Sequence, residues 1–187
     1  KSIARFDNEP DQDVVVIGEG DSKVCVYRGR LDGEIVGVAF ESTDSKGYSG
    51  DITVLVGVTP DGRVAGCKSA DRRRPDDPPC ATKTAEDEAA GHDPEAIIGL
   101  QILRHAETPG LGAVMEEAVY RRQYCGQSLE EETFWAVRKE GGEVDQLTGA
   151  TITSRSVTDA VREGLRFFQE HRDEILNGEP GTCGGAP

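Results

Sequence analysis

The chain has 187 residues and a formal net charge of −14, from 21 basic and 35 acidic side chains. This length predicts one domain, or one domain with an elaborated insertion, which is large enough to bury a core. The acidic balance argues against binding to nucleic acid or to an anionic membrane surface, because both need clustered lysine and arginine. No apolar run approaches the roughly 20 residues of a membrane helix, and no signal-peptide pattern appears at the start.

Short β-branched runs, separated by glycine and aspartate turns, follow a charged lead-in at 1–12. They predict strands at 14–17, 24–27, 34–40 and 52–58, joined by hairpin turns at 31–34 and 59–63. Residues 64–67 are expected to return as the second strand of the last hairpin. This half of the chain therefore predicts an antiparallel sheet.

Residues 68–95 interrupt the pattern with prolines, acidic side chains and three consecutive arginines at 72–74. We interpret this segment as an exposed insertion because it has almost nothing to bury. The arginines could clamp a phosphate or the carboxylates of a partner. Flanking Asp71 and Asp76 favour a solvated, self-compensating loop instead.

Five cysteines are scattered through the chain at positions 25, 67, 80, 125 and 183. None belongs to a Cys-x-x-Cys pair, which argues against a zinc ribbon, a thioredoxin motif and a c-type haem site, and no metal site is predicted. Cys67 and Cys80 bracket the proline-rich arm and could close it in an oxidising compartment. Unpaired thiols are an equally good interpretation.

A strand is predicted at 96–104, then a turn at 105–112 that contains one proline and two glycines, then a helix at 113–123. The turn exposes backbone N–H and C=O groups and projects Leu111, which suits the edge and face of a flat heteroaromatic ring. Taken alone, the turn is more typical of an ordinary strand-to-helix corner.

An aromatic run at 134–139 predicts another strand. Beyond position 154, apolar residues at three- and four-residue spacing predict a helix that continues to about Leu176 and stops at 177–178. Residues 177–187 are rich in glycine and proline and predict a flexible tail. The expected fold class is α+β, with a largely antiparallel sheet, packed helices and a long C-terminal helix.

A short glycine- and hydroxyl-rich stretch at 145–154 leads into that helix. The first helical turn leaves N–H groups unpaired at the positive end of the helix dipole, which favours an anion such as phosphate. Gly149 would let the backbone approach closely, and the nearby hydroxyls could cap the helix, donate to phosphate or be esterified. An ordinary capped helix start is the simpler interpretation, because no full phosphate-loop pattern with a following lysine is present.

Two loops together resemble the motifs of one family. Residues 145–151 read Asp-Gln-Leu-Thr-Gly-Ala-Thr and resemble the Asp-x-x-Ser/Thr-Gly-Ala-Thr flavinylation motif of the FMN-binding domains in membrane electron-transport complexes. Residues 107–112 read Glu-Thr-Pro-Gly-Leu-Gly and resemble the second loop of that family, and 47–50 resemble a third segment. The two similar members are the G subunit of the Rnf complex and the C subunit of the sodium-translocating NADH:quinone reductase.

The resemblance implies a division of the chain into a lead-in and first strand at 1–23, one FMN-binding domain at 24–176 and the tail at 177–187. The insertion at 68–95 departs from the family pattern. The resemblance also implies that Thr151 carries FMN through a phosphoester bond. A separate magnesium-dependent flavin transferase that uses FAD would install this bond. Asp145 is expected to serve that transferase rather than the finished site.

The phosphate is expected beside Gly149 and Ala150, with the hydroxyls of Thr153 and Ser154 offsetting its charge. Leu111 and Leu147 are expected to contact the ring, and backbone groups of the second loop to bond its edge. The full set expected to hold FMN is Leu147, Thr148, Gly149, Ala150, Thr151, Thr153, Ser154, Glu107, Thr108, Gly110, Leu111 and Gly112.

The function implied by the resemblance is an extracytoplasmic electron carrier within a membrane-bound, ion-translocating redox complex. Its partners would be the other subunits, and a helix preceding Lys1 would tether it to the membrane. The chemistry would belong to the flavin, so no catalytic acid, base or nucleophile of the chain is expected. Two alternatives remain: a sensor or scaffold domain that binds flavin reversibly or not at all, and a stand-alone flavin reductase, which no dinucleotide fingerprint supports.

Overall fold

The fold is built on a five-stranded antiparallel sheet whose spatial order, β1-β2-β3-β4-β5, follows the chain. The structure is a computed structural model, and it describes residues 6–65 and 99–183. The strands are β1 (Val14–Ile17), β2 (Val24–Leu31), β3 (Glu34–Gly47), β4 (Gly50–Val58) and β5 (Leu100–Arg104). The predicted α+β class and antiparallel sheet are therefore confirmed.

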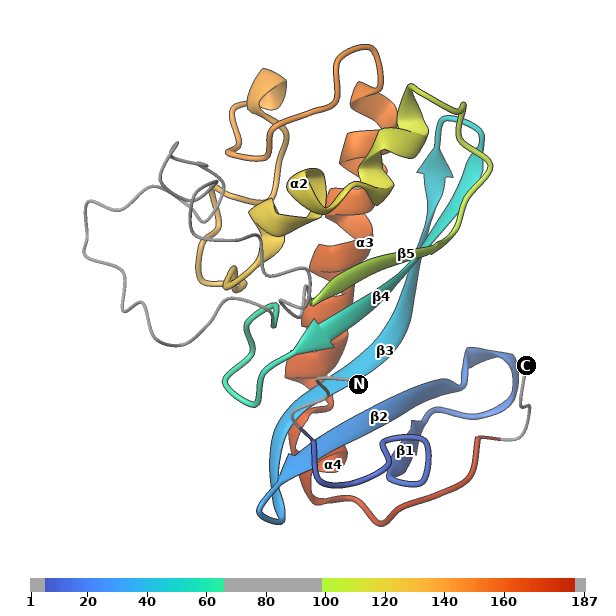
Figure 1. Ribbon diagram of the computed structural model, residues 1–187, viewed down its shortest axis with the longest axis vertical. Helices are drawn as coiled ribbons and strands as arrows, with labels where there is room; N and C mark the ends of the chain where they lie inside the picture. Colours follow the sequence, from blue (N-terminus) through green and yellow to red (C-terminus); the bar gives the residue numbers. More distant parts are fainter. Residues whose placement is uncertain (1–5, 66–98, 184–187) are drawn as a thin grey trace.

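One long helix, α3 (Thr151–Glu170), packs across β3 and β4 (Figure 1). Its core face carries Val157, Val161, Leu165 and Phe168, all fully buried. At Gly164 an added Cβ would lie 3.3 Å from Val56 Cγ2, so this glycine lets helix and sheet approach closely. The Ser42 hydroxyl also donates to the Ala160 carbonyl oxygen at 2.7 Å, which fixes the height of the helix on the sheet.

The remaining helices are short. They are η1 (Gly20–Ser22), η2 (Gly112–Glu116), α2 (Ala118–Arg121), η3 (Arg122–Tyr124), η4 (Arg138–Glu140) and α4 (Arg172–Asn177). None of the helices in the described residues is long and apolar enough to cross a membrane.

The predicted helix at 113–123 is wrong as a continuous element. The chain forms η2, turns extended at Glu117, and then forms α2 and η3. The Arg121 side chain holds this turn, because it donates to the carbonyl oxygens of Glu116 at 3.0 Å and Leu100 at 2.7 Å. These bonds, one of which reaches the first residue of β5, outweigh the local helical preference.

The predicted strand at 134–139 is also wrong. Phe134 and Trp135 are buried by ring packing, with edge-on contacts that run from Tyr124 through Phe134 to Trp135. A single bridge between Val137 and Val144 is the one ladder contact of this run in the described structure. Aromatic burial therefore explains a pattern that resembles a strand. The predicted return strand at 64–67 is represented by one bridge, between Val58 and Val64, before the described residues end at 65.

The C-terminal helix ends where predicted, at Asn177, but it is interrupted at His171, between α3 and α4. The interruption turns α4 so that Ile175 is fully buried and the carbonyl oxygens of Ile175 and Gly178 accept hydrogen bonds from Arg28, at 3.3 and 2.8 Å. Burial of this short helix against β1 and β2 is thus the reason for the break.

Composition predicts loose ends, but the described part of each end is held in place. In the lead-in, the Asp7 N–H donates to the Arg30 carbonyl oxygen at 2.9 Å. In the tail, the Gly181 N–H donates to the Val14 carbonyl oxygen at 2.7 Å, and Cys183 forms a disulfide with Cys25 with a Cα–Cα distance of 6.1 Å. The alternative pairing of Cys67 with Cys80 lies outside the described residues, as does the predicted insertion at 68–95.

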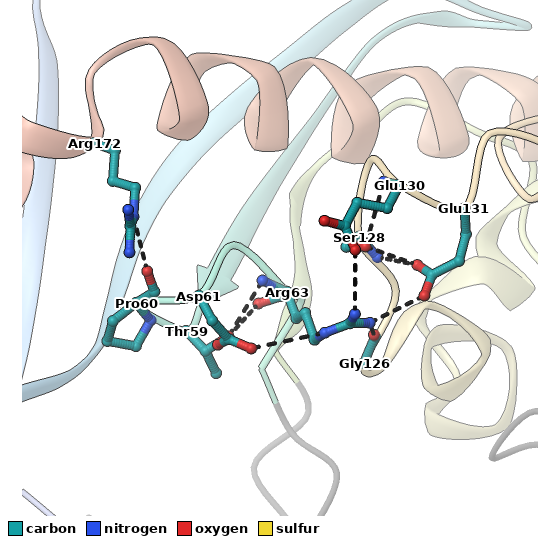
Figure 2. Close-up of polar contacts among 9 residues, drawn as sticks. All are labelled: Thr59, Pro60, Asp61, Arg63, Gly126, Ser128, Glu130, Glu131 and Arg172. Atoms are coloured by element: carbon teal, nitrogen blue, oxygen red, sulfur yellow. Dashed lines mark hydrogen bonds and ion pairs between the residues drawn. The ribbon is translucent and has the colours of Figure 1, made fainter. Parts of the chain in front are cut away.

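The turn that follows β4 is fastened to the loop at 126–131 by Arg63 (Figure 2). Arg63 donates to the Gly126 carbonyl oxygen at 2.9 Å and to the Glu131 carboxylate at 3.0 Å. Burial alone would raise the pKa of Glu131, but the Ser128 backbone N–H and Arg63 outweigh burial and hold this pKa below its ordinary value. The Arg63–Glu131 ion pair therefore stays formed at neutral pH and holds the turn after β4 against the loop 126–131.

Candidate functional site

The segment 145–151 forms a tight turn directly before α3. The Ala150 N–H donates to the Leu147 carbonyl oxygen at 3.0 Å, and Gly149 has φ +78°, which residues with a Cβ rarely adopt. A buried side chain, Gln123, holds the entrance to this turn, because its amide oxygen accepts the Asp145 N–H at 2.8 Å. The turn is therefore fixed at both ends before the helix begins at Thr151.

The first turn of α3 has no side-chain cap. Its N-cap residue is Ala150, which has no polar side chain, and no acidic residue lies in the first turn. The N–H groups of the first three helical residues thus lack partners within the helix, at the positive end of its dipole. The predicted anion site is consistent with this arrangement, and the simpler interpretation of a capped helix start does not describe it.

Burial separates the hydroxyl groups of this region into two classes. Thr153 and Ser154 are buried, and their hydroxyls donate to the Glu107 carboxylate at 2.6 Å and to the Ala150 carbonyl oxygen at 3.0 Å. The Ser154 hydroxyl also accepts the Leu147 N–H at 2.9 Å. These two hydroxyls stabilise the turn and do not face outward, in contrast to the expectation that they would offset a phosphate. Thr151 is partly exposed and Thr148 is exposed.

The second predicted loop, 105–112, is held by its own backbone. The N–H groups of Leu111 and Ala113 both donate to the Thr108 carbonyl oxygen at 3.2 Å. The Glu107 N–H donates to His105 Nδ1 at 3.0 Å, so His105 carries its proton on Nε2, which lies 3.0 Å from a Glu116 carboxylate oxygen. Gly110 has φ +73° and is exposed, which leaves its backbone groups accessible.

The turn 145–151 and the loop 105–112 meet. An added Cβ at Gly149 would lie 3.0 Å from Leu111 Cδ1, so the leucine side chain rests over the glycine. The Thr153–Glu107 hydrogen bond joins the same two loops from the buried side. Leu147, the other expected ring contact, packs against the core instead.

The β3–β4 hairpin supplies a third segment. Gly47 pairs with Gly50, which leaves Tyr48 and Ser49 as a two-residue turn. The Ser49 N–H donates to the Glu107 carboxylate at 2.9 Å. Figure 1 shows this turn beside the loop that follows β5, at the end of the sheet where α3 begins.

Apolar side chains are exposed on all three segments. Tyr48 is 70% exposed, Leu111 41% and Ile152 43%. Because Glu107 joins these segments by hydrogen bonds, their exposed apolar groups offer a binding surface for an apolar or aromatic group. The site thus combines an apolar surface with an uncapped helix start, which suits a ligand that has a flat ring and a phosphate.

Comparisons with known proteins agree with this arrangement. A family model described as FMN-binding domain matches residues 89–166, which include both loops. The G subunit of the ion-translocating oxidoreductase complex from Vibrio vulnificus is 32% identical over 169 residues, covering 88% of this chain and 64% of that protein. The corresponding G subunit from Aliivibrio fischeri strain MJ11 is 31% identical over 182 residues, covering 92% of this chain and 70% of that protein.

The chain belongs to the family of G subunits of ion-translocating oxidoreductase complexes. It spans 64% and 70% of the length of these two relatives. The crystal structure of NqrC from Shewanella oneidensis shares the fold, with a TM-score of 0.52 and 23% sequence identity, over 82% of this chain and 61% of that one.

In this member of the G-subunit family, Asp145 is exposed and its carboxylate lies 2.8 Å from Arg138 Nε. Thr108 is exposed at the outer side of its loop, and Gly112 is buried against Glu107. The structure thus brings together the predicted residues of both loops, with Thr153, Ser154 and Leu147 turned inward.

Sequence reasoning missed the side chains that support the turn 145–151. Besides Gln123, a chain of hydroxyls runs from Tyr120 to Tyr124 at 3.2 Å, on to Thr158 at 2.9 Å, and from Thr158 to the Ser154 carbonyl oxygen at 2.8 Å. Burial raises the pKa of Tyr124 well above its usual value, so its hydroxyl stays protonated and remains a donor. Two tyrosines four residues apart were a signal, but they lie in two short helices, α2 and η3, and no local pattern indicates that they reach Thr158.

Proposed function

We propose that this protein is a flavoprotein electron carrier in which FMN is joined by a phosphoester to the hydroxyl of Thr151. The observation that carries the proposal is the position of this hydroxyl. Thr151 is the first residue of an uncapped helix, and within the described part of the chain its hydroxyl makes no hydrogen bond, whereas those of Thr153 and Ser154 are buried and engaged. Thr148, the other exposed hydroxyl of the turn, lies before the helix begins.

The residues present fit FMN. A phosphate on Thr151 would lie by the unpaired N–H groups at the start of α3, where the helix dipole favours negative charge. Gly149 leaves room where a Cβ would meet Leu111, and Leu111, Ile152 and Tyr48 offer apolar surface for the ring. When bound, FMN supplies transfer of one or two electrons, and the chain supplies position and electrostatics.

Attachment would proceed on a separate flavin transferase with FAD as the donor. The Thr151 oxygen attacks the riboflavin-linked phosphorus of FAD, the new P–O bond forms, and the pyrophosphate bond breaks. AMP leaves, and the hydroxyl proton is released to a base. No oxidant or reductant is consumed, and the exposed Asp145 lies at the start of the turn where a transferase could contact it.

We place the domain on the extracytoplasmic side of a membrane, as a subunit of an ion-translocating redox complex, with the other subunits as its electron partners. The Cys25–Cys183 disulfide supports this location, because disulfides persist in oxidising compartments. The relatives named as the G subunit of an ion-translocating oxidoreductase complex support the assignment to a complex. The insertion at 68–95 remains a candidate docking segment or an inert loop.

Retention of flavin after denaturation distinguishes this proposal from a sensor that binds flavin reversibly. Protein produced together with the transferase is expected to keep flavin fluorescence on a denaturing gel, because a phosphoester survives unfolding. Thr148→Ala is the matched control, since it removes the other exposed hydroxyl of the turn and should label like the wild type. A colourless wild-type band under these conditions would contradict the proposal.

A further inference from the structure

The Glu107 carboxylate joins three segments of the site. It comes from the loop 105–112 and is only 5% exposed. One of its oxygens accepts the Ser49 N–H at 2.9 Å, and the other accepts the Thr153 hydroxyl at 2.6 Å. One buried side chain therefore connects the β3–β4 turn, the second loop and the first turn of α3.

Glycines make room for this carboxylate on two sides. An added Cβ at Gly112 would lie 2.6 Å from Glu107 Oε2, and one at Gly47 would lie 3.1 Å from Glu107 Oε1. The first of these distances is too short for any side chain at position 112. The backbone of two loops is thus packed directly against the carboxylate, so a displacement of Glu107 would displace both.

Hydrogen bonds hold both carboxyl oxygens of Glu107: one oxygen accepts from a backbone N–H and the other from a hydroxyl group. Within residues 6–65 and 99–183, no basic side chain forms an ion pair with it. Thr153 is the third residue of α3, so the carboxylate lies by the positive end of the helix dipole.

We propose that Glu107 is the positioning residue of the flavin attachment site. Its carboxylate assembles the three segments before flavin is attached, and through Thr153 it fixes the helical turn that presents the Thr151 hydroxyl. This inference rests on the proposed attachment of FMN to Thr151. It assigns to Glu107 a role in alignment of the acceptor hydroxyl instead of contact with the ring.

The decisive variant is Glu107→Met, because it keeps the approximate length and volume of the side chain but leaves no oxygen that can accept a hydrogen bond from Ser49 or Thr153. Glu116→Met is the matched control, since Glu116 is an exposed carboxylate that follows the same loop and contacts His105. If Glu107 only filled space, both variants would behave like the wild type.

The first measurement uses protein with Thr151→Ala, which cannot carry flavin, so its result does not depend on attachment. Hydrogen exchange of the Ser49 amide is expected to speed up about tenfold or more in Glu107→Met, because the Ser49 N–H loses its acceptor. Exchange in the interior strand β4 should stay unchanged, which shows that the variant is folded. Equal protection of Ser49 in both proteins would overturn the proposal.

The second measurement is the rate of flavin transfer to the apo chain by the transferase. Misalignment of Thr151 is expected to lower kcat about tenfold or more. KM for the apo chain should change little, because the buried substitution leaves unchanged the exposed surface that the transferase contacts. A variant with an altered KM and normal kcat, or with full wild-type kinetics, would overturn the role in positioning. Failure of the wild-type chain to gain flavin would count against attachment at Thr151 and would leave the exchange result to decide the role of Glu107.

Discussion

The hydroxyl groups in and just after the turn 145–151 differ in burial and in hydrogen bonding. Thr153 and Ser154 look equivalent to Thr151 in the sequence, but each is buried and bonded within the protein. Gly149 reaches φ +78° beneath Leu111, and this conformation places Thr151 at the helix start. The proposed attachment at Thr151 thus depends on the burial and hydrogen bonding of its neighbours.

Gly149→Ala should therefore impair flavin attachment. The added Cβ would strain the left-handed backbone and lie 3.0 Å from Leu111 Cδ1, so we expect a loss of about 1–2 kcal/mol in unfolding free energy and a slower flavin transfer. Gly141→Ala is the matched control, because Gly141 has φ +88° and open space around its Cβ position. Denaturant titration and transfer rates check both variants. Attachment to Gly149→Ala at the wild-type rate would contradict the role given to this glycine.

At the scale of elements, β1, β2 and α4 are tied together by a buried arginine. Arg28 is 1% exposed, bonds Asp13 through its Nε at 2.7 Å, and reaches the carbonyl oxygens at the end of α4. Burial by itself would raise the pKa of Asp13, but Arg30 and Arg28 outweigh burial and hold this pKa below its ordinary value. The ion pair thus fastens the last helix to the first two strands.

Asp13→Asn is expected to lower the unfolding free energy by about 3–5 kcal/mol at pH 7, because it leaves Arg28 buried without its counter-charge. Because the folded pKa of Asp13 is depressed, its contribution is complete above its ordinary pKa and is lost as pH falls through the folded value. The difference between variant and wild type should therefore shrink below about pH 4.

Urea titrations from pH 7 down to about pH 2 check this prediction. Asp61→Asn serves as the control, since Asp61 is exposed and lies 3.7 Å from Arg63, and it should change stability by about 1 kcal/mol or less. A difference for Asp13→Asn that stays constant over the whole titration would show that its charge is not what stabilises α4.

At the scale of the whole molecule, one disulfide closes the chain on itself. Cys25 at the start of β2 and Cys183 near the end of the chain are 158 positions apart. Such a bond restricts the unfolded chain strongly, and it holds the C-terminal segment beside β1.

Replacing both cysteines, Cys25→Ser with Cys183→Ser, is expected to lower the unfolding free energy by about 2–5 kcal/mol. A non-reducing peptide digest should first recover the two cysteines in one linked fragment from the wild-type chain. Reductant should destabilise the wild type by about the same amount as the double substitution. A stability that responds neither to reductant nor to the substitutions would contradict this role.

Local sequence patterns predicted the features that depend only on residues close together in the chain. The strands and the hairpin turn at 31–34 follow from alternation and turn chemistry, and α3 follows from its apolar spacing. The two flavin-family loops were recognisable because each is a contiguous motif. Their meeting through Leu111 and Gly149 could be expected only from the resemblance.

The features that escaped prediction are contacts between distant positions. Gln123 supports Asp145, Glu107 supports Ser49 and Thr153, and Cys25 pairs with Cys183. No local pattern encodes such pairs. The incorrect strand at 134–139 has the same origin, because Phe134 is buried against the ring of Tyr124, which comes from another segment.

The site of attachment can be located directly by mass spectrometry of the tryptic peptide 140–155, which holds Thr148, Thr151, Thr153 and Ser154. After production with the transferase, we expect a gain equal to FMN less one water, with fragment ions that place the added mass on Thr151. The gain should be absent in Thr151→Ala. An unmodified peptide, or one that carries the added mass on Thr148, would contradict attachment at Thr151.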